Sequence, residues 1–273
     1  MEIFKAILFG IIEGITEWLP ISSTGHMILL NEFIRLDVSD EFYKLFEVVI
    51  QLGAILAVVI MYFKTIFPWG FGKTKEDTKD TFNLWGKIIV ACLPAAVIGI
   101  LADDWLDEHL YNSVVVSLML IIYGVIFIVI ESKKFDKSKV ESLKDITYKQ
   151  ALGVGGFQLL SLIPGTSRSG ATIIGGLILG LKRSVAAEFT FFLAIPVMAG
   201  ASALKLLKYV MDVGLVFEAM ELIILGVGCL VAFIISILII KFLMGYIRKH
   251  DFKVFGYYRI VLGIIVLLYF LIK

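Results

Sequence analysis

Two short stretches decide the fold: residues 20–25 read Pro-Ile-Ser-Ser-Thr-Gly, and residues 164–170 read Pro-Gly-Thr-Ser-Arg-Ser-Gly. Each one interrupts a longer apolar stretch, the first at about 3–34 and the second at about 148–181. Proline breaks a helix, and serine, threonine and glycine favour caps and turns. Within a membrane, non-helical backbone persists only where protein or a wet cavity surrounds it. We therefore predict two re-entrant helix–loop–helix hairpins, each of which enters the membrane and returns to the same side.

The composition favours a membrane protein over a soluble one. Of the 273 residues, 59% are hydrophobic and 18% are charged, whereas soluble domains carry about 45–50% apolar and about 25% charged residues. Stretches long and apolar enough to cross the hydrocarbon as helices lie at about 44–63, 85–102, 111–131, 184–207, 217–242 and 255–272. We predict an all-α polytopic membrane protein with six transmembrane helices, surrounded by membrane lipids, and a single domain over residues 1–273. No nucleic-acid partner is expected.

The two interrupted stretches resemble each other. When the two stretches are aligned at an offset of 144 residues, Pro20 coincides with Pro164 and Ser23 with Ser167. Apolar composition alone matches leucines readily, but not a proline and a serine in the same setting. We infer an internal repeat, with repeat 1 at about 1–131 and repeat 2 at about 148–273.

Charge predicts the orientation of the chain. Three predicted loops are rich in lysine and arginine, at about 64–87, 132–149 and 243–254, whereas a short predicted loop, the acidic segment at 103–110, carries four acidic residues and no lysine or arginine. The positive-inside rule places the basic loops in the cytoplasm and the acidic segment outside. The first hairpin then opens from outside and the second from the cytoplasm. This is an inverted-topology repeat, an arrangement that typically builds a site near the midplane.

The first hairpin carries two carboxylates, Glu13 and Glu17, which share one face of a helix because they are four residues apart. Each charge near the bilayer centre costs about 2.5–3.5 kcal/mol on insertion scales, and neighbouring carboxylates repel each other. A divalent cation between them relieves both costs, and Mg²⁺ also takes phosphate oxygens. We predict that Glu13 and Glu17 bind Mg²⁺ or Ca²⁺. The alternative is that both side chains are hydrated in the outer membrane interface and have no functional role.

Ser22, Ser23 and Thr24 follow directly and are typical of a helix N-cap. A half-helix N-terminus inside a cavity also offers free amides and a positive dipole end to phosphate. We predict that Ser23 is a nucleophile. His26 lies three residues further on, close enough to act as its general base. A packing role for His26, and an activated water in place of Ser23, stay open.

The second hairpin supplies positive charge through Arg168. An arginine in a membrane loop needs an anion, and its planar fork matches phosphate oxygens. Neighbouring residues expected to help bind phosphate are Gly165, Ser167, Ser169 and Thr172. The alternative for Arg168 is a structural ion pair with Glu13 or Glu17. Gln51, on the first full span, is predicted as a substrate ligand or as an interhelical hydrogen bond.

Three stretches of the sequence resemble those of a known protein family. EGITEWLPISSTGH at 13–26, PGTSRSGAT at 164–172 and FEVVIQLGAILAV from Phe46 onward resemble the undecaprenyl-diphosphate phosphatase family, also called bacitracin-resistance proteins. The resemblance runs over nearly the whole chain, with both signatures in the expected order. Neither signature departs from the family's pattern.

The resemblance implies hydrolysis of undecaprenyl diphosphate to the monophosphate and inorganic phosphate, which recycles the lipid carrier for cell-wall synthesis and confers bacitracin resistance. It also implies a polyprenyl diphosphate lipid as substrate and a multi-pass location in the bacterial cell membrane. The predicted topology puts the reaction at the extracytoplasmic face, and a homodimer stays open. The rival hypothesis is a lipid or small-anion transporter, because inverted repeats with re-entrant hairpins are typical of transporters. A serine and a histidine beside an anion site favour the phosphatase.

Overall fold

The computed structural model describes residues 1–70, 72–133, 140–214 and 216–272. Three lysines of the predicted basic loop at 132–149 lie outside the described residues: Lys134, Lys137 and Lys139. The same holds for three side chains of the predicted acidic segment: Asp103, Asp104 and Asp107.

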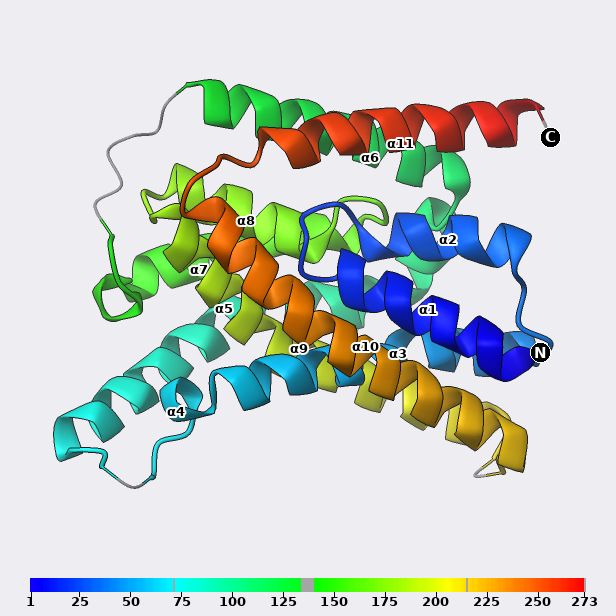
Figure 1. Ribbon diagram of the computed structural model, residues 1–273, viewed down its shortest axis with the longest axis horizontal. Coiled ribbons are helices and arrows are strands. Elements are labelled where there is room, and N and C mark those ends of the chain that lie inside the picture. The colour runs from blue at the N-terminus through cyan, green and yellow to red at the C-terminus, as the bar shows by residue number, and fades with distance from the viewer. Residues whose placement is uncertain (71, 134–139, 215, 273) are drawn as a thin grey trace.

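The described chain is built from helices (Figure 1). In order these are α1 (Glu2–Thr16), α2 (Ser23–Phe33), α3 (Asp40–Met61), α4 (Phe63–Ile66), α5 (Lys75–Leu110), α6 (Ser113–Ser132), η1 (Leu143–Asp145), α7 (Tyr148–Leu159), η2 (Leu160–Leu162), α8 (Arg168–Ile178), α9 (Arg183–Asp212), α10 (Ala219–Ile247) and α11 (Lys253–Ile272).

Helices α3, α5, α6, α9, α10 and α11 are long and apolar enough to cross a membrane. They coincide with the six predicted spans, so the prediction of an all-α polytopic membrane protein is confirmed. One boundary was wrong. The acidic segment at 103–110 was expected to be a loop, but it forms the last turns of α5. Acidic residues do not stop a helix, and the chain turns only beyond Leu110.

The two hairpins enter the bundle from opposite ends and meet in its middle (Figure 1). Helices α1 and α2 have 15 and 11 residues, which corresponds to lengths of about 22 and 16 Å at 1.5 Å per residue. The hydrocarbon core is about 30 Å thick, so neither helix crosses it. Helices α7 and α8 are equally short, with 12 and 11 residues. The four short helices therefore form two re-entrant hairpins.

The loops end in the same type of cap. Ser22 and Ser167 both have positive φ angles, 73° and 72°. Each hydroxyl accepts a hydrogen bond from the amide three residues later, Gly25 or Gly170. The structural equivalent of Ser167 is therefore Ser22, and the predicted match of Ser23 with Ser167 was wrong. The second loop has one more residue between its proline and its cap, which constant spacing does not detect.

Each hairpin packs on a long helix from the other half of the chain. Helix α1 lies against α10, where a Cβ on Gly10 would come within 2.7 Å of a carbonyl oxygen of α10. Helix α7 lies against α5, where a Cβ on Gly155 would come within 2.3 Å of a carbonyl oxygen of α5. Small residues permit such close helix contacts in membranes. The halves thus interlock, which is how an inverted pair brings both loops to one place. The predicted repeat boundaries stay a prediction.

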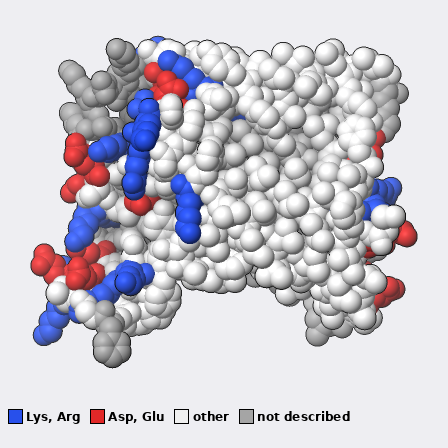
Figure 2. Space-filling model, viewed as in Figure 1, with Lys and Arg blue, Asp and Glu red and all other residues white. Residues whose placement is uncertain are grey.

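Charged side chains gather at the two ends of the molecule (Figure 2). A broad uncharged belt separates these ends, and most of the lysine and arginine visible on this face lie at the end where α5 begins. Both chain termini lie at the opposite end (Figure 1). By the positive-inside rule, we expect the end with the lysines to be the cytoplasmic one, and we use that name for it. We call the other end the outer end.

Candidate functional site

A cavity of about 390 Å³ opens beside the first re-entrant loop. Of the predicted site residues, those that line it are Glu13, Ser23, Thr24 and Gln51. The start of α3, the turn before α6 and the last part of α9 close its other sides. All three segments lie toward the outer end (Figure 1).

Glu17 joins the two loops. Its Oε2 accepts a hydrogen bond of 2.8 Å from the Ser23 hydroxyl, and its Oε1 forms a 3.0 Å ion pair with Nη2 of Arg168. Nη1 of Arg168 donates to the carbonyl of Thr190 at 2.8 Å. Both charged side chains are at most 9% exposed. The predicted nucleophile, carboxylate and arginine therefore form one continuous network. The structure therefore contains the ion pair between Arg168 and Glu17 that was the alternative to phosphate binding by Arg168.

Glu13 lies on the cavity wall and is 1% exposed, yet its Oε1 is buried without a hydrogen-bond partner. A carboxylate oxygen in this position fits a cation, because Mg²⁺ and Ca²⁺ take carboxylate oxygens and phosphate completes the shell of Mg²⁺. Glu17, one turn away, is already engaged on both oxygens. Among the described residues, no three His, Cys, Asp or Glu side chains gather closely enough to hold a metal alone. Glu13 thus has an oxygen that fits a cation, whereas Glu17 can contribute one only when one of its two contacts opens.

His26 does not contact Ser23. Its Nδ1 lies 2.7 Å from the carbonyl oxygen of Ser22, and its Nε2 lies 2.7 Å from the hydroxyl of Tyr258. The two rings are also stacked. The contact expected for a general base on Ser23 is therefore made by Glu17 instead. Spacing of three residues does not bring the side chains together, because α2 begins at Ser23 and the imidazole turns back to the cap residue.

The other predicted phosphate ligands with hydroxyl groups bond to the protein itself, and only Ser169 joins one loop to the other. Ser169 donates to the carbonyls of Glu17 and Leu19, at 3.1 and 3.3 Å, and Thr172 donates to the carbonyl of Arg168 at 2.9 Å. Ser22 and Ser167 are the caps described above, and Ser167 also bonds to Ser169. None of these hydroxyls lies in the cavity lining.

Gly165 has a different task. It has a φ of +89°, a value that favours glycine. A Cβ at this position would lie 2.5 Å from the carbonyl oxygen of Val116 in α6. Gly165 thus lets the loop approach α6.

Several residues of the cavity were not predicted as site residues. Lys44, Lys205 and Tyr111 line it, together with Glu47, whose carboxylate accepts a hydrogen bond from Tyr43. A lysine near the end of a span, such as Lys205, commonly extends its ammonium group to the membrane interface. The structure places Lys205 in the cavity wall. Only the fold could reveal this, because the lysines belong to helices far apart in the sequence.

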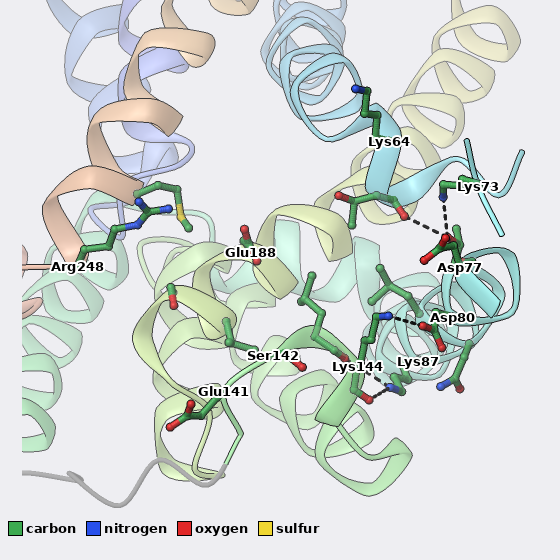
Figure 3. A pocket seen from close by; sticks show the side chains of 18 residues that line it. Lys64, Lys73, Asp77, Asp80, Lys87, Glu141, Ser142, Lys144, Glu188 and Arg248 are labelled. Atoms are coloured by element: carbon green, nitrogen blue, oxygen red, sulfur yellow. Dashed lines mark hydrogen bonds and ion pairs between the residues drawn. The ribbon is translucent and has the colours of Figure 1, made fainter. Parts of the chain in front are cut away.

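A second cavity, of about 480 Å³, lies at the cytoplasmic end and contains none of the predicted site residues (Figure 3). Its charged groups are largely bonded to one another or to the chain. Lys144 pairs with Asp80 at 2.5 Å, Lys87 donates to two carbonyls of the η1 segment, and Lys73 donates to Thr81. The contacts of Lys144 and Lys87 tie η1 to α5, and Lys73 is tied to α5 through Thr81. The larger cavity therefore has a structural explanation, and the smaller one holds the candidate chemistry.

Comparison with known proteins gives the family of this chain. The family model described as "Bacitracin resistance protein BacA" matches residues 6–265. A relative from Enterococcus faecalis named undecaprenyl-diphosphatase is 60% identical over 271 residues, which cover 98% of this chain and 97% of the relative. Proteins of the same name from Desulfitobacterium hafniense and Acetivibrio thermocellus are 61% and 57% identical, each over 99% of this chain and over 96% and 98% of their own lengths. The chain therefore belongs to the bacitracin resistance protein BacA family.

Proposed function

We propose that this protein hydrolyses undecaprenyl diphosphate to undecaprenyl phosphate and inorganic phosphate. The observation that carries the proposal is the Glu17 carboxylate, which contacts the Ser23 hydroxyl and the Arg168 guanidinium beside a cavity. A nucleophile, a proton acceptor and a phosphate-binding cation are the groups that phosphoryl transfer needs. The names of the relatives agree with this activity.

In the first step Ser23 Oγ attacks the terminal phosphorus, and Glu17 receives the hydroxyl proton. The bond between that phosphorus and the bridging oxygen breaks, and the prenyl monophosphate leaves with the electron pair. After Glu17 has released its proton to solvent, water attacks the phosphoserine and gives Glu17 a proton. The bond between phosphorus and Ser23 Oγ breaks, the proton passes from Glu17 to Oγ, and hydrogen phosphate is released. A direct attack by water, activated by Glu17, is the alternative route. The carboxylate has the same task in both.

Arg168 binds the diphosphate by exchanging its bond to Glu17 for phosphate oxygens, since its guanidinium is not in the cavity lining. This exchange frees one oxygen of Glu17. Glu13 and Glu17 would then hold Mg²⁺ or Ca²⁺ together with the substrate. Such a cation, when bound, neutralises charge on the phosphate oxygens.

The cavity faces the outer end, so we propose that hydrolysis takes place at the extracytoplasmic face. Lys44 and Tyr111, on its wall, belong to segments at that end. Undecaprenyl diphosphate is released outside during cell-wall synthesis, so the enzyme would recycle the carrier lipid where it appears. Bacitracin binds the diphosphate form, so its removal would confer resistance.

The direct test is phosphate release from farnesyl diphosphate by the purified protein. We expect release with Mg²⁺ or Ca²⁺ and a loss of at least 50-fold with EDTA, restored by added cation. No release from a C15 or a C55 diphosphate in several detergents would contradict the phosphatase. Flux assays in liposomes would then test the transporter hypothesis.

The same assay also tests the orientation. In sealed right-side-out vesicles, we expect release from geranyl diphosphate added outside without permeabilisation. If release requires permeabilisation, the cavity faces the cytoplasm.

Replacing Ser23 by alanine distinguishes the two routes. If the serine is the nucleophile, we expect kcat to fall by at least about 100-fold, and acid quenching with terminally labelled substrate to leave phosphoserine on the wild-type chain. The control is Ser117→Ala, since Ser117 is a buried serine whose hydroxyl bonds within α6. Activity near the wild-type level in Ser23→Ala would assign the attack to water.

A further inference from the structure

Arg259 is fully buried in α11, yet it belongs neither to the predicted site nor to the cavity lining. A charged side chain inside a membrane span is costly, and its persistence there points to a function. We propose that Arg259 is a positioning residue that holds the two re-entrant loops in the alignment that the reaction requires. This inference rests on the proposed phosphatase activity.

The guanidinium of Arg259 donates to backbone carbonyls of both loops. Its Nη1 bonds to the carbonyl oxygen of Pro20 at 3.1 Å. Its Nη2 bonds to those of Gly165 and Thr166, at 2.8 and 2.9 Å. Longer bonds, of 3.4 and 3.5 Å, reach two carbonyls of α6. One side chain from the last span thus ties together the first loop, the second loop and α6.

Arginine is the residue type that this junction needs. Loop carbonyls inside a membrane have no helical partner, and each unpaired one is costly. The guanidinium offers five donors in a rigid plane, so it can reach three carbonyls on two loops at once, whereas a lysine offers three donors from a single point. The start of α8 leaves room for it, because a Cβ on Gly170 would lie only 3.2 Å from Nη1 of Arg259.

The bonds from Arg259 to the two loops, which we call the Arg259 clamp, differ from the other contacts between the loops. Those contacts are made by Arg168, which pairs with the Glu17 carboxylate, and by Ser169, which donates to the carbonyls of Glu17 and Leu19. In the proposed mechanism the ion pair between Arg168 and Glu17 opens when phosphate binds, which leaves, in the residues that the structure describes, only the Ser169 bonds between the two loops. Arg259 contacts only backbone atoms, apart from the ring of Tyr123, which lies 5.5 Å away. It can therefore hold the loops throughout the reaction cycle.

Arg259 also brings a charge that no carboxylate balances within the described part of the chain, as judged by ion pairs of up to 4.0 Å. It lies beside the capped N-termini of α2 and α8, whose dipoles are positive at that end. If this charge bound substrate directly, its loss would raise KM. A positioning role predicts a lower kcat instead, since misaligned groups slow the chemical step.

Steady-state kinetics of Arg259→Lys and Arg259→Gln test the proposal. The lysine variant keeps the charge, so it remains testable if the glutamine variant does not fold. With farnesyl diphosphate, and at a temperature where melting curves show each variant fully folded, we expect Arg259→Lys to lose at least 30-fold in kcat with KM changed less than threefold. The control is Arg183→Lys, because Arg183 pairs with Glu131 away from the loops. A kcat within threefold of wild type in the folded lysine variant would overturn the proposal, as would a loss confined to KM.

A second measurement does not depend on activity. Trp18 lies in the first loop, is fully buried, and packs edge-on against Phe191. With the three other tryptophans replaced by phenylalanine, we expect Arg259→Lys to increase acrylamide quenching of Trp18 at least twofold, and Arg183→Lys to leave it unchanged. Unchanged quenching in Arg259→Lys would show that the loop does not need the clamp. If the wild type releases no phosphate at all, the proposed function fails, and quenching alone decides on the clamp.

Discussion

The Glu17→Gln variant is expected to lose about 10³-fold in kcat while its KM does not rise. Proton transfer by a positioned side chain contributes typically about 10²–10⁴-fold, and Glu17 is the group that accepts the hydrogen bond of Ser23. Glutamine has the same shape, and the backbone carbonyl of residue 17 still accepts from Ser169. The loss is therefore expected in the chemistry, with the fold intact.

The KM of this variant carries further information. Glu17 competes with phosphate for Arg168 if the ion pair opens when substrate binds. An amide is a weaker competitor than a carboxylate, so at a cation concentration that saturates the variant we expect KM to stay the same or to fall. The matched control is Glu131→Gln, which removes a carboxylate from an ion pair with Arg183 at the cytoplasmic end. A kcat within tenfold of wild type in Glu17→Gln would exclude Glu17 as the proton acceptor.

Much of the fold could be predicted because membrane physics acts on the sequence directly. Six apolar stretches had to be helices, since lipid leaves the backbone no other partner, and the structure has a helix at each one. The proline, glycine and serine residues at 20–25 and 164–170 predicted a break in each short apolar stretch, and a loop is found at both, although the loops end at the starts of α2 (Ser23) and α8 (Arg168). The predictions that were wrong concern local structure. The match of Ser23 with Ser167 ignored the extra residue in the second loop, and the acidic end of α5 was interpreted as a loop.

The candidate site could be predicted in its residues but not in its pairings. Intramembrane charge identified Glu13, Glu17 and Arg168, because each is costly to bury without a task. Sequence spacing then suggested His26 as the partner of Ser23, whereas the loop turns the Ser23 hydroxyl toward Glu17. Arg259 was missed although the same rule identifies it.

Arg259 is the only charged residue in the predicted span at 255–272. The lysines of the cavity wall gave no comparable signal, because they lie near the ends of spans.

The Arg168→Lys variant is expected to lose about 10³-fold in kcat/KM, because a lysine keeps the charge but not the planar fork that matches phosphate. Cationic clamps on a transferring phosphoryl group contribute about 10³–10⁵-fold in related chemistry. Arg168 is held in place by the carbonyl of Thr190 at 2.8 Å, so its Nη2 can exchange Glu17 for the substrate while Nη1 stays anchored. Phosphate release against substrate concentration measures the loss, and Arg183→Lys is again the control.

A double variant separates this role from a purely structural ion pair. Removing one partner of a buried pair leaves an uncompensated charge, whereas removing both is often nearly neutral. If Arg168 serves only to neutralise Glu17, then Glu17→Gln combined with Arg168→Gln should recover the melting temperature and the activity that either single variant loses. If the two side chains act on the substrate, the double variant should regain stability and remain at least about 10³-fold below wild type in kcat/KM. If the ion pair is only structural, the double variant recovers both melting temperature and activity. If the side chains act on the substrate, it recovers the melting temperature alone, so measuring both on one preparation decides between the two hypotheses.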